Sequence, residues 1–198
     1  MLTARKLLQG RGSYLDDIRV PRLAHVVFVR SPHAHATIKS IDGNIGSDDL
    51  ISALDGPTTV IGGAGIDTIT TGQGNDVILG DNGIATYITA GTTPTSIGKI
   101  VFSNDGILVA IESSFFTDGG NDLIDAGEGV NAVILGFGSD TFTGGGSTDI
   151  VIGDNGKALF DNLGLITYIE TNNESLVGNY ADLITGGGGD NIIFGGNE

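Results

Sequence analysis

The sequence predicts an all-β fold, a parallel β-roll or β-solenoid of nine-residue repeats interrupted by β-rich inserts, preceded by a short, partly ordered N-terminal segment. Three observations support this prediction. Glycine accounts for 34 of the 198 residues, well above the usual share of about 7%. Acidic residues outnumber basic residues 24 to 9. Glycine, aspartate and a large apolar residue also recur in phase every nine residues.

The repeat follows the pattern G-G-x-G-x-D-x-U-x, in which U is a large apolar residue. Residues 62–79 read GGAGIDTIT and TGQGNDVIL. Counting by nines places these residues at position six: Asp49, Thr58, Asp67, Asp76, Ala85, Asp122, Asn131, Asp140, Asp149, Ala158, Asp182 and Asn191. Position eight is apolar every time: Ile51, Val60, Ile69, Ile78, Tyr87, Ile124, Val133, Phe142, Val151, Phe160, Ile184 and Ile193.

A second, longer period divides the chain into blocks. Asp49 and Asp122 are 73 residues apart, as are Asp81 and Asp154, and Gly-Asp-Asn-Gly occurs at both 80–83 and 153–156. The segments GILVAIES (106–113) and GLITYIET (164–171) are typical of strands. We therefore expect an N-terminal segment (1–43), repeat block one (44–83), an insert (84–117), repeat block two (118–156), an insert (157–177) and repeat block three (178–198). Ala85 and Ala158 mark where the repeats give way to the inserts.

Each repeat should contribute one short strand and one tight turn. The residues around position eight favour a strand of about three residues, and the glycines that follow permit the positive φ of a turn. Two repeats, or 18 residues, then make one flattened coil. Stacked coils form two parallel sheets with the position-eight side chains between them.

Burial in so thin a core is marginal, and a row of carboxylates at position six adds like-charge repulsion. A calcium ion resolves both problems, because it takes six to eight oxygens from carboxylates and backbone carbonyls. Equivalent turns are 18 residues apart, so Asp49 should pair with Asp67, Asp122 with Asp140 and Asn131 with Asp149. The pair of Thr58 with Asp76 lacks one charge and should be weak or empty. The alternative is that these aspartates only solvate turns.

The predicted calcium ligands are therefore position-six side chains and the backbone of nearby turn glycines. They are Asp49, Asp67, Asp76, Asp122, Asn131, Asp140, Asp149, Asp182, Gly63, Gly65, Gly72, Gly74, Gly120 and Gly138.

From about residue 44 to 198 the chain resembles the RTX, or haemolysin-type, calcium-binding repeat proteins. The segments that carry the resemblance are GGAGID, GQGNDVI, GGNDLID, GFGSDTF and GGGGDN. The resemblance implies a parallel β-roll, calcium-coupled folding and export, often by type I secretion machinery with an uncleaved C-terminal signal. It also implies a secreted or cell-surface protein, and the interrupted array is closest to large adhesive or structural proteins. A cell-surface or protein partner is then expected, but the sequence does not identify it.

The N-terminal segment has different chemistry. Residues 1–42 hold seven of the nine basic residues and carry a formal charge of +4, against −19 for residues 43–198. The pieces GRG-Y-DDI (10–18), VRSPHAHA (29–36) and IKSID (38–42) resemble the start of the molybdenum-hydroxylase large subunit of aldehyde oxidases, xanthine dehydrogenases and carbon monoxide dehydrogenases. No catalytic residue of that family can be carried over. His33 and His35 share one face of a strand but make an incomplete metal site, so a role in the fold is favoured.

Composition and motifs exclude several other functions. The chain has no cysteine for a disulfide or thiolate metal site, no clustered lysine and arginine for nucleic acid, and no apolar run long enough to span a membrane. The N-terminus lacks the pattern of a cleavable signal peptide. G-x-S-x-G and H-E-x-x-H are absent, so no catalysis is expected. Two alternatives stay open: a fragment or subunit of a molybdenum-dependent oxidoreductase, and a solenoid that needs no metal.

Overall fold

The computed structural model describes residues 48–89, 106–172 and 180–196, and these residues form strands and turns without any helix. The described residues all belong to one compact unit, which lies within Thr37–Glu198. No membrane-spanning helix occurs in the part of the chain that the structure describes.

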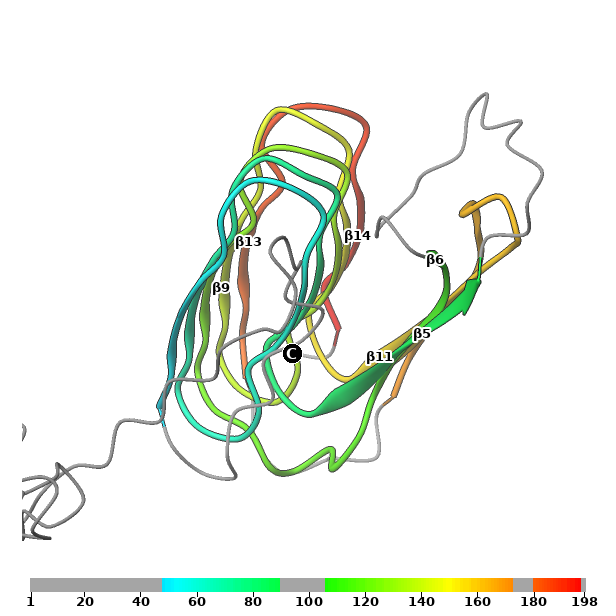
Figure 1. Cartoon of the computed structure of the whole chain (residues 1–198). Helices are drawn as coiled ribbons and strands as arrows, with labels where there is room; N and C mark the ends of the chain where they lie inside the picture. The colour runs from blue at the N-terminus through cyan, green and yellow to red at the C-terminus, as the bar shows by residue number, and fades with distance from the viewer. Residues whose placement is uncertain (1–47, 90–105, 173–179, 197–198) are drawn as a thin grey trace, which may run out of the picture. The chain divides into compact units, whose positions relative to one another are not determined.

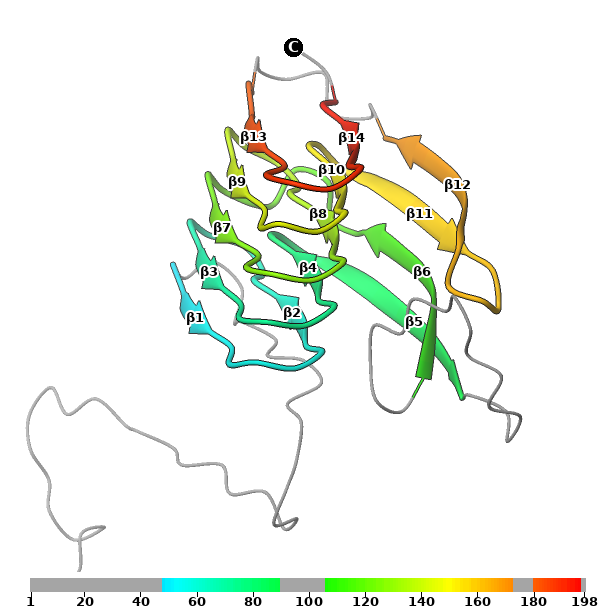
Figure 2. The same cartoon turned by 90° about the horizontal axis from the view of Figure 1, so that it is seen from above.

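Ten strands of three residues each build two parallel sheets (Figure 2). The first sheet has the order β1 (Leu50–Ser52), β3 (Thr68–Thr70), β7 (Leu123–Asp125), β9 (Thr141–Thr143) and β13 (Leu183–Thr185). The second has the order β14 (Ile192–Phe194), β10 (Ile150–Ile152), β8 (Ala132–Ile134), β4 (Val77–Leu79) and β2 (Thr59–Ile61). The chain alternates between the two sheets, so the expected short strands and parallel sheets are present.

The register shows how the repeats continue across the inserts. Within a block, Leu50 pairs with Thr68, one coil further along the chain. Across the first insert, Thr68 pairs with Leu123, and across the second, Thr141 pairs with Leu183. Each insert therefore leaves the stack and returns to it in phase, and all five coils form one continuous pair of sheets.

The core between the two sheets consists mainly of position-eight side chains, as expected from the repeat, together with Ala126 and Leu135. Eight position-eight side chains are buried in it: Ile51, Val60, Ile69, Ile78, Ile124, Val133, Phe142 and Val151. Ile184 packs against this core, whereas Ile193 in the last strand is 44% exposed. Tyr87 and Phe160 take position eight when the register is extended by nines, but they do not lie in this core. The structure places them in β5 (Gly83–Thr89) and β11 (Gly156–Phe160) of the inserts.

The inserts form a third, antiparallel sheet of order β12 (Ile166–Thr171), β11, β6 (Gly106–Ser113) and β5. This sheet lies beside the second parallel sheet (Figure 1). A second core joins them, with Leu108, Ile111 and Phe160 of the inserts against Leu79 and Ile134. The middle strands of the second parallel sheet are therefore buried on both faces, which explains their fully apolar sequences VIL, AVI and IVI.

Candidate metal centre

The position-six side chains form a ladder along each edge of the stacked coils. On one edge, each aspartate Oδ1 accepts a hydrogen bond from the backbone N–H of the preceding position-six residue. Asp49 N donates to Asp67 at 2.7 Å, Asp67 N to Asp122 at 2.8 Å, Asp122 N to Asp140 at 2.7 Å and Asp140 N to Asp182 at 2.9 Å. The ladder therefore also joins Asp67 to Asp122 and Asp140 to Asp182, pairs that lie on either side of an insert.

The opposite edge repeats this arrangement with mixed side chains. Thr58 N donates to Asp76 Oδ1 at 2.8 Å, and Asp76 N donates to Asn131 Oδ1 at 2.9 Å. Asn131 N and Nδ2 both reach Asp149 Oδ1, at 3.3 and 2.9 Å, and Asp149 N donates to Asn191 Oδ1 at 2.8 Å. Two asparagines and one threonine thus make this edge less acidic than the other.

The second carboxylate oxygen is the unusual feature of the aspartates. Oδ2 is buried and has no hydrogen-bond partner in Asp67, Asp76, Asp122, Asp140, Asp149 and Asp182. Buried polar atoms are normally paired, and a buried, unpaired charge is strongly destabilising. Burial therefore raises the pKa of Asp122 to about 8, of Asp140 to about 7 and of Asp149 to about 6.

The asparagines show what surrounds this second atom. Asn191 Nδ2 donates to the carbonyls of Gly186 and Gly188, both at 3.0 Å, and Asn131 Nδ2 donates to those of Ala126 and Gly129, both at 3.3 Å. The amide thus fills a ring of backbone carbonyl oxygens within its own turn. A carboxylate Oδ2 in the same place faces oxygens that cannot donate to it, so an aspartate turn requires a cation or a proton there.

Glycine at position one keeps space open beside Oδ2. A Cβ added to Gly153 would lie 2.5 Å from Asp182 Oδ2 and 2.6 Å from the Gly195 carbonyl oxygen. Added Cβ atoms at Gly62, Gly80 and Gly144 would likewise meet the Oδ2 of a position-six aspartate and the backbone carbonyl of the next coil. Four turns therefore share a cradle of carboxylate and carbonyl oxygen that a side chain would fill.

The donor set fits a hard cation such as calcium, because every candidate ligand atom is an oxygen. Within the described ranges, no three acidic or histidine side chains gather closely enough to hold a metal. Backbone carbonyls would therefore have to complete the ligand shell. Calcium bound there would cancel the buried negative charge and link adjacent coils.

Some of the predicted side-chain ligands are placed to bind a cation, and others are not. The six aspartates with an unpaired Oδ2 fit the role. Asn131 does not, because its Oδ1 accepts from Asp76 N and its Nδ2 donates to carbonyls, which closes its turn without a metal. Asp49 lies in the first coil, where its backbone N–H joins the ladder. Thr58 joins the ladder only through its backbone N–H to Asp76.

The predicted glycines lie where successive turns stack closely. Gly63, Gly65 and Gly138 have φ of +107°, +130° and +146°, which other residues rarely adopt. A Cβ on Gly120 would collide with the Gly65 carbonyl, and one on Gly74 would lie 2.6 Å from the Gly56 carbonyl. On Gly72, a Cβ would lie 2.6 Å from Asp55 Oδ1. Their small size therefore permits the coil spacing that the ladders require.

Sequence reasoning missed the role of the Gly-Asp-Asn-Gly segments, although their 73-residue spacing could have indicated it. Asp81 is buried, and its carboxylate accepts hydrogen bonds from Gly120 N, at 3.2 Å, and from Phe137 N. Burial raises its pKa to about 9, with smaller contributions from Asp122 and Asp140. Asp154 takes the corresponding place in the second segment, where a Cβ added to Gly196 would collide with its carboxylate.

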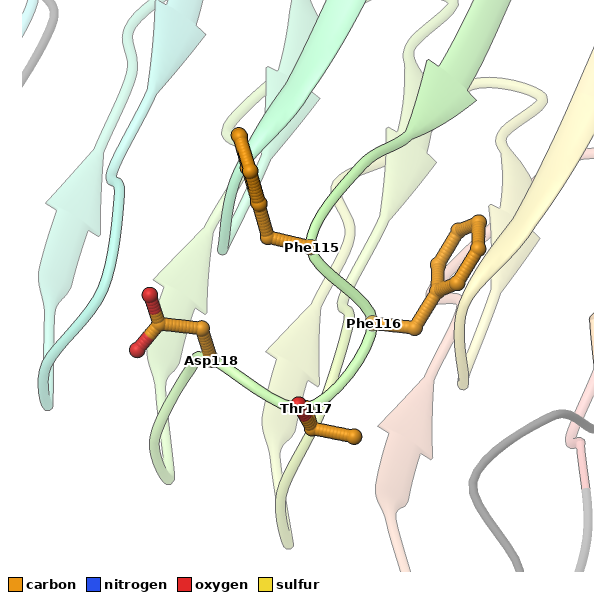
Figure 3. A pocket seen from close by; sticks show the side chains of 4 residues that line it. All are labelled: Phe115, Phe116, Thr117 and Asp118. Carbon is orange, nitrogen blue, oxygen red and sulfur yellow. The ribbon is translucent and has the colours of Figure 1, made fainter.

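Two pockets lie on the inserts rather than at the ladders. One is lined by Phe115, Phe116, Thr117 and Asp118, whose side chains point in different directions from the loop after β6 (Figure 3). The other lies beside the ion pair of Lys157 with Glu112, whose charged atoms are 2.7 Å apart. None of the unpaired carboxylate oxygens lines either pocket. His33, His35 and the N-terminal motifs lie outside the described residues.

Comparison with known proteins gives two different relationships. The family model "RTX calcium-binding nonapeptide repeat (4 copies)" matches residues 114–142, 131–157 and 171–198. The model "Aldehyde oxidase and xanthine dehydrogenase, a/b hammerhead domain" matches residues 9–74. The end of the second match overlaps β1, β2 and β3, which the structure places in the parallel sheets of the repeats. Within segment 54–63, β2 therefore pairs in the same parallel sheet as the strands of the later repeats.

Curated relatives match over the N-terminal part of the chain. The carbon monoxide dehydrogenase large chain of Afipia carboxidovorans is 54% identical over 37 residues, which are 19% of this chain and 5% of that protein. The nicotine 6-hydroxylase large subunit of Paenarthrobacter nicotinovorans is 54% identical over 43 residues, 22% of this chain and 5% of that protein. The chain thus spans about one twentieth of these relatives. No solved structure matches it. The chain therefore joins a segment similar to the hammerhead domain of aldehyde oxidases and xanthine dehydrogenases to repeats that match the RTX calcium-binding family.

Proposed function

We propose that the repeats form a calcium-binding parallel β-roll whose folding is coupled to the ion. The observation that carries the proposal is the set of six aspartates, each with one oxygen in the ladder and one buried oxygen that has no partner. Calcium accepts such oxygens together with backbone carbonyls, and the repeats within residues 114–157 and 171–198 match a calcium-binding family. Without the ion, carboxylate repulsion opposes stacking; with it, neighbouring coils are linked.

The direct test follows folding of the full chain with and without the ion. Circular dichroism and thermal unfolding are measured in excess chelator, in millimolar calcium and in millimolar magnesium as a control. We expect a gain of β signal and a higher melting temperature in calcium, because a ligand that binds the folded state alone stabilises it. Equal spectra and melting temperatures in chelator and calcium would refute the proposal and favour the metal-independent solenoid.

A site-directed test separates ligand loss from general damage. Asp67→Ala removes a ladder carboxylate and should weaken calcium binding, whereas Thr58→Ala changes the position-six residue that supplies no carboxylate and should leave it nearly unchanged. Calorimetric titration of both variants with calcium measures the difference. Equal losses of affinity would show that position six acts through the fold alone.

Calcium-coupled folding also suggests where the protein works. Calcium is scarce inside cells and abundant outside, so we propose a secreted or cell-surface protein whose repeats have an adhesive or structural role and no catalysis of their own. Fractionation of the producing cells, with detection of the chain in the medium or at the surface, tests this. Recovery of all the chain from the cytoplasm would contradict it.

A second candidate function rests on the N-terminal match to molybdenum-enzyme large subunits. Under this proposal the chain is a fragment or subunit of a molybdenum-dependent oxidoreductase. Molybdenum and molybdopterin are measured in the purified chain, alone and with any protein that copurifies with it. Their stoichiometric presence would support this candidate, whereas their absence together with bound calcium would leave the repeat function alone.

A further inference from the structure

Each insert leaves the stack in the middle of a turn. The chain runs through Gly80, Asp81 and Asn82, departs into β5 and β6, and returns at Gly119 to finish the turn with Asp122. A Cβ on Gly80 would lie 2.5 Å from Asp122 Oδ2, so the departing and returning segments meet at this carboxylate. We call the turn formed by residues 80–82 and 119–122 the split turn.

The Asp81 side chain lies where the repeat otherwise has glycine. Gly63 holds the equivalent position two in the preceding turn, beside Asp67. Asp81 instead places a buried carboxylate against two backbone segments, where it accepts hydrogen bonds from Gly120 N and Phe137 N, and a Cβ added to Gly136 would collide with it. It therefore adds a second acid to a turn that already contains Asp122.

Asp122 provides the independent indication of a ligand. This residue is only 2% exposed, and its Oδ2 has no hydrogen-bond partner and faces the space that Gly80 leaves open. The Leu135 carbonyl oxygen borders the same space. Each Asp81 oxygen receives one N–H and keeps a further lone pair, so it can still bind a cation.

We propose that Asp81 and Asp122, with backbone carbonyls that include Leu135, form a calcium site in the split turn that differs from the other turns by its extra carboxylate. This inference rests on the proposed calcium function and deepens it. Affinity in calcium sites rises with the number of charged ligands, so this site fills before that of Asp67. Asp154 and Asp182 form the same combination where the second insert departs, beside Gly153 and the Gly195 carbonyl.

The position of the site links calcium to the inserts. Asn82 Nδ2 donates to the Asp118 carbonyl at 3.0 Å, and Ser114 N donates to the Asn82 carbonyl at 2.9 Å. Asn155 Nδ2 donates to the Phe116 carbonyl at 2.9 Å. An ion between Asp81 and Asp122 therefore fixes both ends of the β5–β6 excursion and with them the base of the antiparallel sheet.

The test compares the full-length protein with Asp81→Asn, Asp67→Asn and Asp118→Asn. Asp118 is exposed beside the split turn, so its variant makes the same charge change without removing a buried carboxylate oxygen. Calcium binding is measured by calorimetry and stoichiometry by native mass spectrometry. Asp81→Asn should lose the tightest calcium or weaken it on the order of tenfold or more. Asp67→Asn should lose a weaker calcium, and Asp118→Asn should match the parent.

If Asp81→Asn fails to fold, a crystal structure of the unmodified protein with calcium tests the proposal instead. An ion that contacts both the Asp81 and Asp122 carboxylates supports the proposal. An ion on Asp122 alone, or unchanged calcium binding in folded Asp81→Asn, overturns it and leaves Asp81 as a clamp for backbone N–H groups. If the parent protein binds no calcium at all, the proposed function fails as well. If it binds calcium but not through Asp81, only the inference about the split turn fails.

Discussion

Asp140→Asn is the most informative substitution, because the chain already has an asparagine, Asn131, at position six of another turn. Asp140 is 1% exposed, and its Oδ2 has no partner. An asparagine there should donate its amide to the carbonyls of its own turn, as Asn131 does at Ala126 and Gly129. The variant should therefore lose a calcium ligand and gain stability when calcium is absent.

The size of this gain follows from the Asp140 pKa. Burial, assisted by the charge of Asp154, raises it from 3.8 to about 7. The ionised folded state is then disfavoured by about 4 kcal/mol at pH 8 relative to the unfolded chain. Asparagine removes this penalty, so the free energy of unfolding in chelator should increase by up to about 4 kcal/mol.

Urea unfolding at pH 8, followed by circular dichroism in chelator and in calcium, measures both effects. The variant should be more stable than the parent in chelator, and calcium should stabilise it less than the parent. Asp118→Asn, which makes the same change at an exposed side chain, should behave as the parent in both conditions. A variant that is less stable than the parent in chelator would refute the reasoning that an amide satisfies the carbonyl ring.

Three further predictions concern pH, turn geometry and the core. Burial raises the pKa of Asp122 to about 8, so the calcium-free folded state binds more protons than the unfolded chain. The free energy of unfolding without calcium should therefore fall as pH rises from about 4 to 8, which denaturant titrations measure. A free energy of unfolding that rises over this range would contradict the burial argument. Gly129→Ala forces a side chain onto φ +120° against the Gly74 carbonyl and should lower the melting temperature, whereas Gly195→Ala, with open space around it, should not. Phe142→Ala should cost about 3–5 kcal/mol in urea unfolding, and Leu50→Ala, 82% exposed, less than about 0.5 kcal/mol.

The nine-residue pattern was sufficient to predict the short strands, the parallel sheets and their inner core. Position eight predicted the burial of Ile69 and Phe142 because a fixed period places every such residue on one face. Tyr87 and Phe160 lie in the predicted inserts, where the nine-residue count no longer applies because the strands pair antiparallel and follow the two-residue period of an ordinary sheet.

The second core and the ladder across the inserts could not be derived in the same way. The apolar runs VIL, AVI and IVI indicated strands buried on both faces, but not which segment covers them. The pairing of Asp67 with Asp122 depends on where the chain returns after 55 residues, and no local pattern encodes that return. Aspartate is a common turn residue, so the sequence does not single out Asp81. Only its burial against Gly120 and Phe137 distinguishes it from other turn aspartates.

The split turns also set the order in which the chain can assemble. Closing a coil within a block brings together residues 18 apart, whereas closing the coil across the first insert spans 55 residues. The longer loop costs about 1 kcal/mol more in chain entropy, which slows that closure about fivefold if the loop must form before its contacts. Folding should then proceed as rapid winding within each block, separated by slower pauses at Asp67–Asp122 and Asp140–Asp182, so the inserts act as kinetic boundaries in a stack that is continuous at equilibrium.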